Sequence, residues 1–204
     1  MTTAELIRPK AKGKAKAKRL WTYAEMVAEL PETNLPVELW NGELIMSPAP
    51  HPDHEEITLN FAATLKDFVT RKNLGKVYAS PIDVVLTSRR VVQPDVIFIS
   101  KARLGIVKQC IDGVPDLAME VISEHSRRRD RIEKKALYEQ AGLLEYWIIG
   151  PDNETIEVFA LTSGAYQLHS KATVEQNAVS KLLAAFSVSF KQLLPRRRPS
   201  PTLI

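Results

Sequence analysis

Three acidic segments decide the fold of this chain, and they follow one another as VVQPDVIFIS (91–100), PDLAMEVIS (115–123) and RRRDRIEKKALYEQAG (127–142). The first two are short apolar runs typical of buried β-strands, and each carries a carboxylate, Asp95 or Glu120. A lone buried charge is costly, so each carboxylate needs a partner. The third segment predicts a helix that sets Asp130, Lys134 and Tyr138 four residues apart on one face.

A divalent metal ion is the simplest partner for two such carboxylates. If Asp95 and Glu120 lie on neighbouring strand ends, they can bind Mg²⁺ or Mn²⁺ together with waters and substrate phosphate oxygens. An ion held there can activate a phosphodiester for hydrolysis. A nearby lysine such as Lys134 can orient the attacking water and neutralise charge on the phosphate. The sequence therefore indicates a candidate metal-dependent phosphodiesterase site.

Helix and strand signals also occur outside these segments. A helix is expected over 22–30 with Thr22 as its cap, and a hairpin over VELWNGELIM (37–46), because Asn-Gly between apolar residues is a strong turn signal. A long helix is expected from Asp53, as its cap, to about Lys72. The last helix should run over 130–140 and end at Gly142. Further strands are expected at 76–79, 82–86, 91–99, 117–122, 145–149 and 155–161, before a mixed region at 174–190. This order indicates an α/β or α+β fold with one mixed sheet.

Length and composition fit one globular domain. The chain has 204 residues, of which 45% are hydrophobic, so it can bury a proper core. No apolar run approaches the ~18 residues of a membrane span, and the N-terminus lacks the apolar region of a secretory signal. The single cysteine, Cys110, excludes a disulfide within the chain and a Cys-based zinc cluster. We expect a cytoplasmic protein with no membrane partner.

The net charge of +4 is unevenly spread. Basic side chains gather at the two ends, at Arg8, Lys10, Lys12, Lys14, Lys16, Lys18 and Arg19 and at Arg196, Arg197 and Arg198, and leave an acidic body. We expect residues 1–20 to be a disordered basic arm, 21–192 the folded domain and 193–204 a basic, proline-rich tail. Such an arm can hold a polyanion with a strong salt dependence, although a solubilising extension is the simpler interpretation.

The chain resembles the Uma2-like proteins, a domain of unknown function described as restriction endonucleases. The resemblance covers roughly residues 20–190 and rests on VELWNGELIMSP (37–48), His54, VVQPDVIFIS and the run from PDLAMEVIS through EYWII (115–149). That family is similar to the PD-(D/E)XK nuclease superfamily. The resemblance implies a restriction-endonuclease-like core, in which a mixed central β-sheet is flanked by helices and two adjacent strands carry a metal ion. It also implies DNA as the partner.

The resemblance assigns the signature residue by residue. Pro94-Asp95 matches the "PD" and Glu120 the second acid, but the position of the signature lysine is Ile122. Lys134 on the following helix is the expected substitute, because only the place of its ammonium in space matters.

Two more residues are implied to line the site, Glu43 and His54. Each has a simpler interpretation, since Glu43 can pair across the hairpin and His54 can be a surface residue at a helix start. Glu38 and Asp130 have weaker claims, because cross-strand pairing and the helix dipole account for them.

The expected activity is metal-dependent hydrolysis of DNA phosphodiester bonds by an endonuclease that uses Mg²⁺ or Mn²⁺. Two other interpretations stay open. A protein with this fold could have lost catalysis and kept nucleic-acid binding, which the isoleucine at 122 favours. An oligomeric regulatory protein could use the carboxylates as a structural network. A homodimer would suit a nuclease that cuts both strands of a duplex.

Overall fold

The computed structural model describes residues 19–30, 36–123 and 126–193, and its centre is a mixed β-sheet. The strands of this sheet, in spatial order, are β11 (Ala165–Ala172), β10 (Thr155–Thr162), β9 (Glu145–Gly150), β8 (Leu117–Val121), β6 (Val96–Ser100) and β3 (Gly75–Ala79). β8 and β9 run parallel, and the other neighbours are antiparallel. The expected mixed sheet is confirmed.

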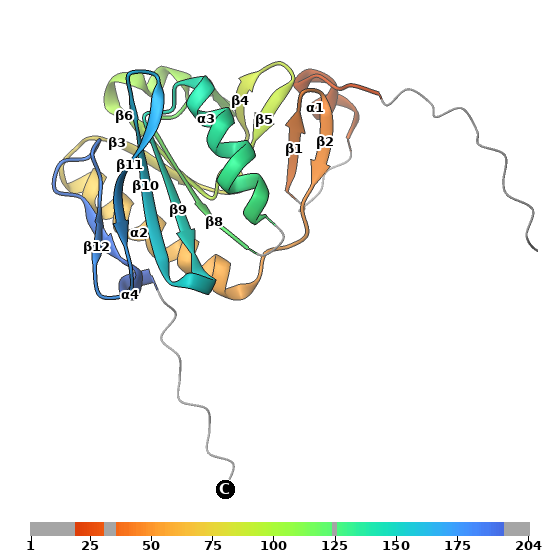
Figure 1. Ribbon diagram of the computed structural model, residues 1–204. Helices are drawn as coiled ribbons and strands as arrows, with labels where there is room; N and C mark the ends of the chain where they lie inside the picture. The colour runs from red at the N-terminus through yellow and green to blue at the C-terminus, as the bar shows by residue number, and fades with distance from the viewer. Residues whose placement is uncertain (1–18, 31–35, 124–125, 194–204) are drawn as a thin grey trace, which may run out of the picture.

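Helices cover the two faces of the central sheet (Figure 1). On one face, α2 (Pro52–Arg71) buries Ile57, Phe61, Leu65 and Val69, with Phe68 partly buried beside them. On the other face, α3 (Lys135–Ala141) packs Leu137 and Tyr138 against the sheet. The predicted cap of the long helix is wrong. His51 lies at the N-cap, where its Nδ1 accepts a hydrogen bond from the backbone N–H of Asp53, and the proline at 52 begins the helix.

A second sheet packs beside the first and was not expected from the sequence. Its strands, in spatial order, are β2 (Glu43–Met46), β1 (Val37–Trp40), β5 (Arg90–Val92), β4 (Val84–Thr87) and β7 (Ile111–Asp112). The predicted hairpin forms its outer pair, with positive φ at both Asn41 and Gly42 of the turn. The predicted first helix is also confirmed as α1 (Tyr23–Glu29), capped by Thr22 in a capping box with Glu25.

The two sheets are joined at a position where the sequence predicted one continuous strand over 91–99. β5 ends at Val92 and β6 begins at Val96, and each belongs to a different sheet. Pro94 has no N–H to donate to a strand ladder, so the chain leaves one sheet and enters the other across Gln93–Asp95. Asp95 therefore lies in a crossover between two sheets rather than inside a strand.

The last helix carries the spaced residues of the third acidic segment. It begins with a π-helical stretch, η3 (Arg129–Lys134), continues as α3 and ends at Gly142, whose φ of 82° confirms the predicted cap. The remaining elements are η2 (Lys101–Ile106), η4 (Pro151–Asn153), β12 (Asn177–Val179), β13 (Ser187–Ser189) and α4 (Phe190–Leu193).

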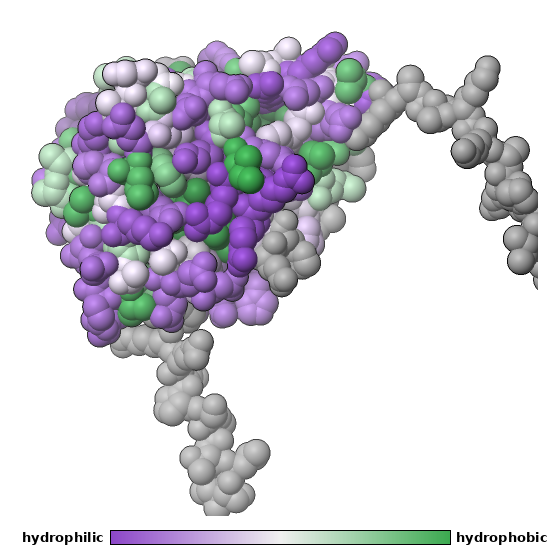
Figure 2. All heavy atoms as spheres, in the orientation of Figure 1, coloured by the Kyte–Doolittle hydropathy of each residue, from purple (hydrophilic) through white to green (hydrophobic). Residues whose placement is uncertain are grey.

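The visible face of the molecule in Figure 2 is mainly polar. Hydrophilic residues predominate there, and the hydrophobic ones are scattered. Among the described helices, none is long and apolar enough to cross a membrane. The predicted arm and tail lie almost entirely in 1–18 and 194–204, outside the described residues, and stay predictions.

Candidate active site

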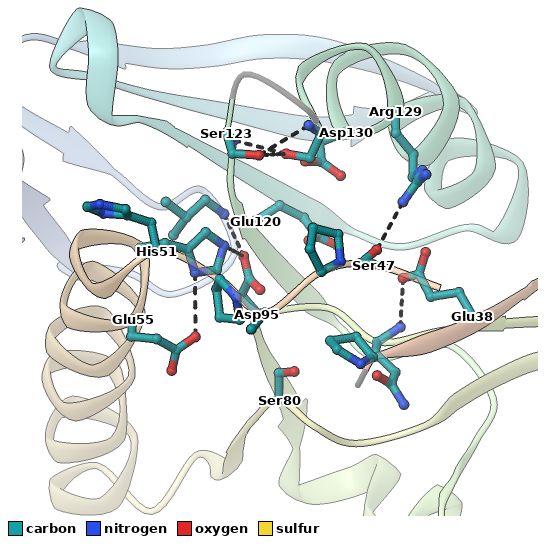
Figure 3. Close-up of a pocket in the computed structure, with 18 of the residues that line it drawn as sticks. Glu38, Ser47, His51, Glu55, Ser80, Asp95, Glu120, Ser123, Arg129 and Asp130 are labelled. Carbon is teal, nitrogen blue, oxygen red and sulfur yellow. Dashed lines mark hydrogen bonds and ion pairs between the residues drawn. The ribbon is translucent and has the colours of Figure 1, made fainter. Parts of the chain in front are cut away.

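A cavity of about 500 Å³ opens where the N-terminus of α2, the start of β6, the end of β8 and η3 meet. Its lining includes four of the five sequence-predicted site residues, which are His54, Asp95, Glu120 and Lys134. It also includes Glu38 from the second sheet (Figure 3). The cavity therefore lies between the two sheets, at the crossover that Pro94 imposes on the chain.

Glu120 faces the side of the central sheet that α3 covers, because side chains alternate along β8. Leu117, Met119 and Val121 pack under α2, so Glu120 points the other way, towards the last helix. There its Oε1 lies 2.8 Å from the Lys134 Nζ and accepts a hydrogen bond of 2.9 Å from the Tyr138 hydroxyl. Residues four apart on the helix thus reach one strand carboxylate, as the spacing predicts.

Lys134 is buried among carboxylates. Its Nζ lies 3.0 Å from Glu38 Oε1 and 3.8 Å from Asp130 Oδ1, in addition to the contact with Glu120. Ile122, at the position of the signature lysine, is buried in the apolar cluster beneath the last helix. The strand therefore has no lysine at position 122, and the ammonium beside Glu120 comes from Lys134 on the helix.

Asp95 approaches Glu120 through the register of the sheet. Val96 pairs with Met119 in antiparallel strands, which brings the residue before β6 next to the end of β8. Asp95 Oδ2 accepts a hydrogen bond of 2.7 Å from the backbone N–H of Val121 and lies 3.2 Å from His54 Nε2. Burial acts to lower the pKa of His54, but the hydrogen bond and charge of Asp95 outweigh it and raise that pKa. The contact with Asp95 therefore stabilises the protonated form of His54, and the imidazole in turn holds the Asp95 carboxylate.

The cavity contains more negative than positive groups. The carboxylates of Glu38, Glu55, Asp95, Glu120 and Asp130 line it, against the fixed cations Arg129 and Lys134. Burial raises the pKa of Glu120 well above its usual range and also raises the pKa of Asp130. Burial acts to lower the pKa of Lys134, but its carboxylate neighbours, Glu120 first, raise it well above the usual range. The excess of carboxylates over fixed cations makes the cavity a negative environment, which a bound cation would relieve.

A divalent cation fits this donor set with two protein ligands. Among the described residues, no group of three or more His, Cys, Asp or Glu side chains is arranged to hold a metal ion. Mg²⁺ needs fewer, because it uses one or two carboxylates and completes its shell with water and phosphate oxygens. The contacts described above engage Oδ2 of Asp95 and Oε1 of Glu120, so the second oxygen of each is left as a hard donor.

Glu43 is not brought to this cavity. It lies on β2 opposite Trp40 and lines a separate cavity of about 370 Å³. From the sequence Glu38 had a weaker claim than Glu43, but the structure places Glu38, and not Glu43, at this cavity. The signal for Glu38 was a carboxylate between apolar residues in VELW, the same signal that singled out Glu120.

Arg129 lines both cavities, and its guanidinium donates a hydrogen bond of 3.2 Å to the Ser47 hydroxyl across the rim (Figure 3). It comes from the arginine cluster before the last helix. The charge run alone does not single out one arginine. Arg129 is distinguished from its neighbours by burial in the structure, since it is half-buried while Arg127 and Arg128 are exposed.

A mixed sheet between helices, with carboxylates and a lysine gathered at one end of its strands, defines a protein of restriction-endonuclease-like fold. The model of the Uma2 family, described as "Putative restriction endonuclease", matches residues 24–193, and the chain belongs to this family. The fold is also that of a crystal structure described as a putative nuclease belonging to DUF820 from Anabaena variabilis ATCC 29413. The two share 18% sequence identity with a TM-score of 0.70, over 84% of this chain and 96% of the other. No curated protein matches the chain.

Proposed function

We propose that this protein is an endonuclease that hydrolyses DNA phosphodiester bonds with Mg²⁺ or Mn²⁺ held by Asp95 and Glu120. The observation that carries the proposal is the meeting of these two carboxylates with the Lys134 ammonium in one cavity. Membership of the Uma2 family supports the same reaction class.

Each residue then has a distinct part in the reaction. A divalent ion held there supplies Lewis acidity to the phosphoryl group. Lys134 donates a hydrogen bond to the attacking water and offsets the negative charge that builds on the phosphate. Its pKa is raised by the surrounding carboxylates, so it acts as a cation and not as a base. His54 holds Asp95 in place, and Arg129 at the rim is suited to contact a substrate phosphate.

The test is cleavage of supercoiled plasmid and of single-stranded DNA, with Mg²⁺, with Mn²⁺ and with a chelator. Wild type is compared with Asp95→Ala and Glu120→Ala. Glu157→Gln serves as the matched control, because Glu157 is a buried carboxylate paired with Arg131 and Lys171 outside the cavity. We expect metal-dependent nicking or cutting in wild type and in the control, and its loss in the other two variants.

If wild type binds DNA and leaves it intact with either metal, the protein is a binding module that has lost catalysis. If it neither binds DNA in a salt-sensitive manner nor binds metal, a regulatory role for the carboxylate network replaces the proposal. A homodimer would place one cavity on each strand of a duplex, and light scattering on the purified protein measures that state directly.

A further inference from the structure

We infer that Glu38 is a positioning residue that aims the Lys134 ammonium at the reacting phosphate, an inference that rests on the proposed nuclease function. Glu38 comes from β1 of the second sheet and lines the cavity together with Asp95 (Figure 3). It lies outside the strands that carry the PD and acidic signature residues.

The Glu38 carboxylate is a fixed acceptor. It is 4% exposed, and it is held by groups that cannot move independently of the fold. Its Oε1 accepts a hydrogen bond of 3.0 Å from the backbone N–H of Gln93, and its Oε2 accepts one of 3.0 Å from the Trp40 indole. The same Oε1 lies 3.0 Å from Lys134 Nζ. Glu38 is therefore in place whether or not substrate is bound.

An ammonium has three N–H donors in a rigid tetrahedral arrangement. Lys134 donates one hydrogen bond to Glu120, and the Glu38 carboxylate lies 3.0 Å from the same Nζ as an ion pair, so two carboxylates on different elements hold the ammonium in place. Lys134 lines the cavity, so a donor that Glu120 does not engage can face a group inside it. Glu120 is also shared with Tyr138 and is a proposed metal ligand, which leaves Glu38 as the carboxylate with no second task in the reaction.

Direct metal binding by Glu38 is a different role with different consequences. Both of its oxygens already accept hydrogen bonds, so a cation would have to share an oxygen with one of these donors. A ligand role would raise the metal concentration needed for half-maximal activity when Glu38 is replaced. A positioning role changes kcat at saturating metal and leaves that concentration unchanged.

The experiment compares Glu38→Gln with wild type and with the Glu157→Gln control for kcat, KM and the Mg²⁺ dependence of DNA cleavage. We expect kcat to fall about 100-fold, with KM and the half-saturating Mg²⁺ concentration within about twofold of wild type. In Glu38→Gln the new amide NH₂ can face the Trp40 indole N–H, which is also a donor. The double variant Glu38→Gln/Trp40→Phe removes that indole donor. It should regain stability and still show the low kcat. An unchanged kcat, or a raised half-saturating metal concentration, overturns the inference.

A second readout separates this inference from the proposed function. A hydrogen-bonded buried ammonium exchanges its protons slowly, so the ¹⁵N signal of the Lys134 Nζ should be visible by NMR in wild type. It should broaden or shift in Glu38→Gln and stay unchanged in Glu157→Gln. If wild type cuts no DNA while this signal responds, the positioning contact stands and the nuclease proposal fails. If the signal is indifferent to Glu38, the inference fails whatever the activity.

Discussion

Lys134 is the residue on which the charge balance of the cavity and the proposed chemistry both depend. Replacement by methionine keeps the length of the side chain and removes the ammonium that Glu38, Glu120 and Asp130 face. We expect a loss of about 3–5 kcal/mol in the free energy of unfolding, since one partner of a buried ion pair is removed, and a fall in kcat of about 10²–10³-fold. Urea denaturation and plasmid cleavage measure the two effects.

The neighbour Lys135 gives the control for that substitution, because its ammonium packs over the Phe159 ring and does not line the cavity. Lys135→Met should keep wild-type cleavage. Equal activity of wild type and Lys134→Met would contradict the assigned role.

The titrating residues of the cavity predict how metal-free stability depends on pH. The pKa values of Glu120, Asp130 and His54 are all raised in the folded protein. A raised folded pKa contributes stability that is complete below the unfolded value and is lost as pH rises through the folded value. The pKa of Glu157 is lowered, so its contribution to stability is already complete above the ordinary glutamate pKa. That contribution stays constant at the higher pH values at which the raised groups titrate. The melting temperature without metal should therefore fall from about pH 5 to pH 9.

Metal should offset that fall, because a ligand that binds only the folded state stabilises it. We expect Mg²⁺ or Mn²⁺ to raise the melting temperature more at pH 8.5 than at pH 5.5, measured by differential scanning fluorimetry. Asp95→Asn removes one proposed ligand and should lose most of the gain. A metal-free protein that is more stable at pH 8.5 than at pH 5.5 would argue against the raised pKa values.

At the scale of elements, the alternation of side chains along a strand predicts which positions can place a lysine ammonium near Glu120. Residue 122 follows Glu120 by two positions and so lies on the same face of the strand. We expect Lys134→Ala/Ile122→Lys to cut DNA about tenfold faster than Lys134→Ala, because it returns an ammonium to that face near Glu120. The double variant should still be less stable than wild type, since Ile122 packs in the apolar cluster under the last helix. Plasmid cleavage and thermal melting test this, and no gain over Lys134→Ala would show that the helix position is required.

Elements with a local signal were predictable from the sequence, and those decided by long-range pairing were not. The hairpin followed from Asn41-Gly42, and the shared helix face followed from the spacing of Asp130, Lys134 and Tyr138. The division of 91–99 between two sheets was missed, although Pro94 marked the break. β11 was also missed, because it is an edge strand with mostly exposed side chains and no apolar alternation. Glu38 lines the same cavity as Asp95 only because the second sheet exists.

At the scale of the whole molecule, the place where the basic arm joins the domain predicts that the arm contributes to DNA binding. The arm enters the described structure at Arg19, and the next residue, Leu20, lines the smaller cavity. Arg129 lines that cavity and the candidate active site, so Arg19 and Leu20 lie close to the candidate active site. The lysines of residues 10–18 directly precede this point in the sequence.

Deletion of residues 1–18 should therefore weaken DNA binding at low salt and leave kcat at saturating DNA unchanged. Each lost phosphate contact lowers the slope of log affinity against log salt by about 0.9 for duplex DNA. Fluorescence anisotropy between 50 and 300 mM KCl, in the range where this effect is strong, gives that slope for the full chain and for the deletion variant. A smaller slope with unchanged kcat assigns the arm to the DNA backbone. Identical slopes would mean that the arm serves solubility alone, and that the arginines at the cavity rim supply the electrostatic contacts.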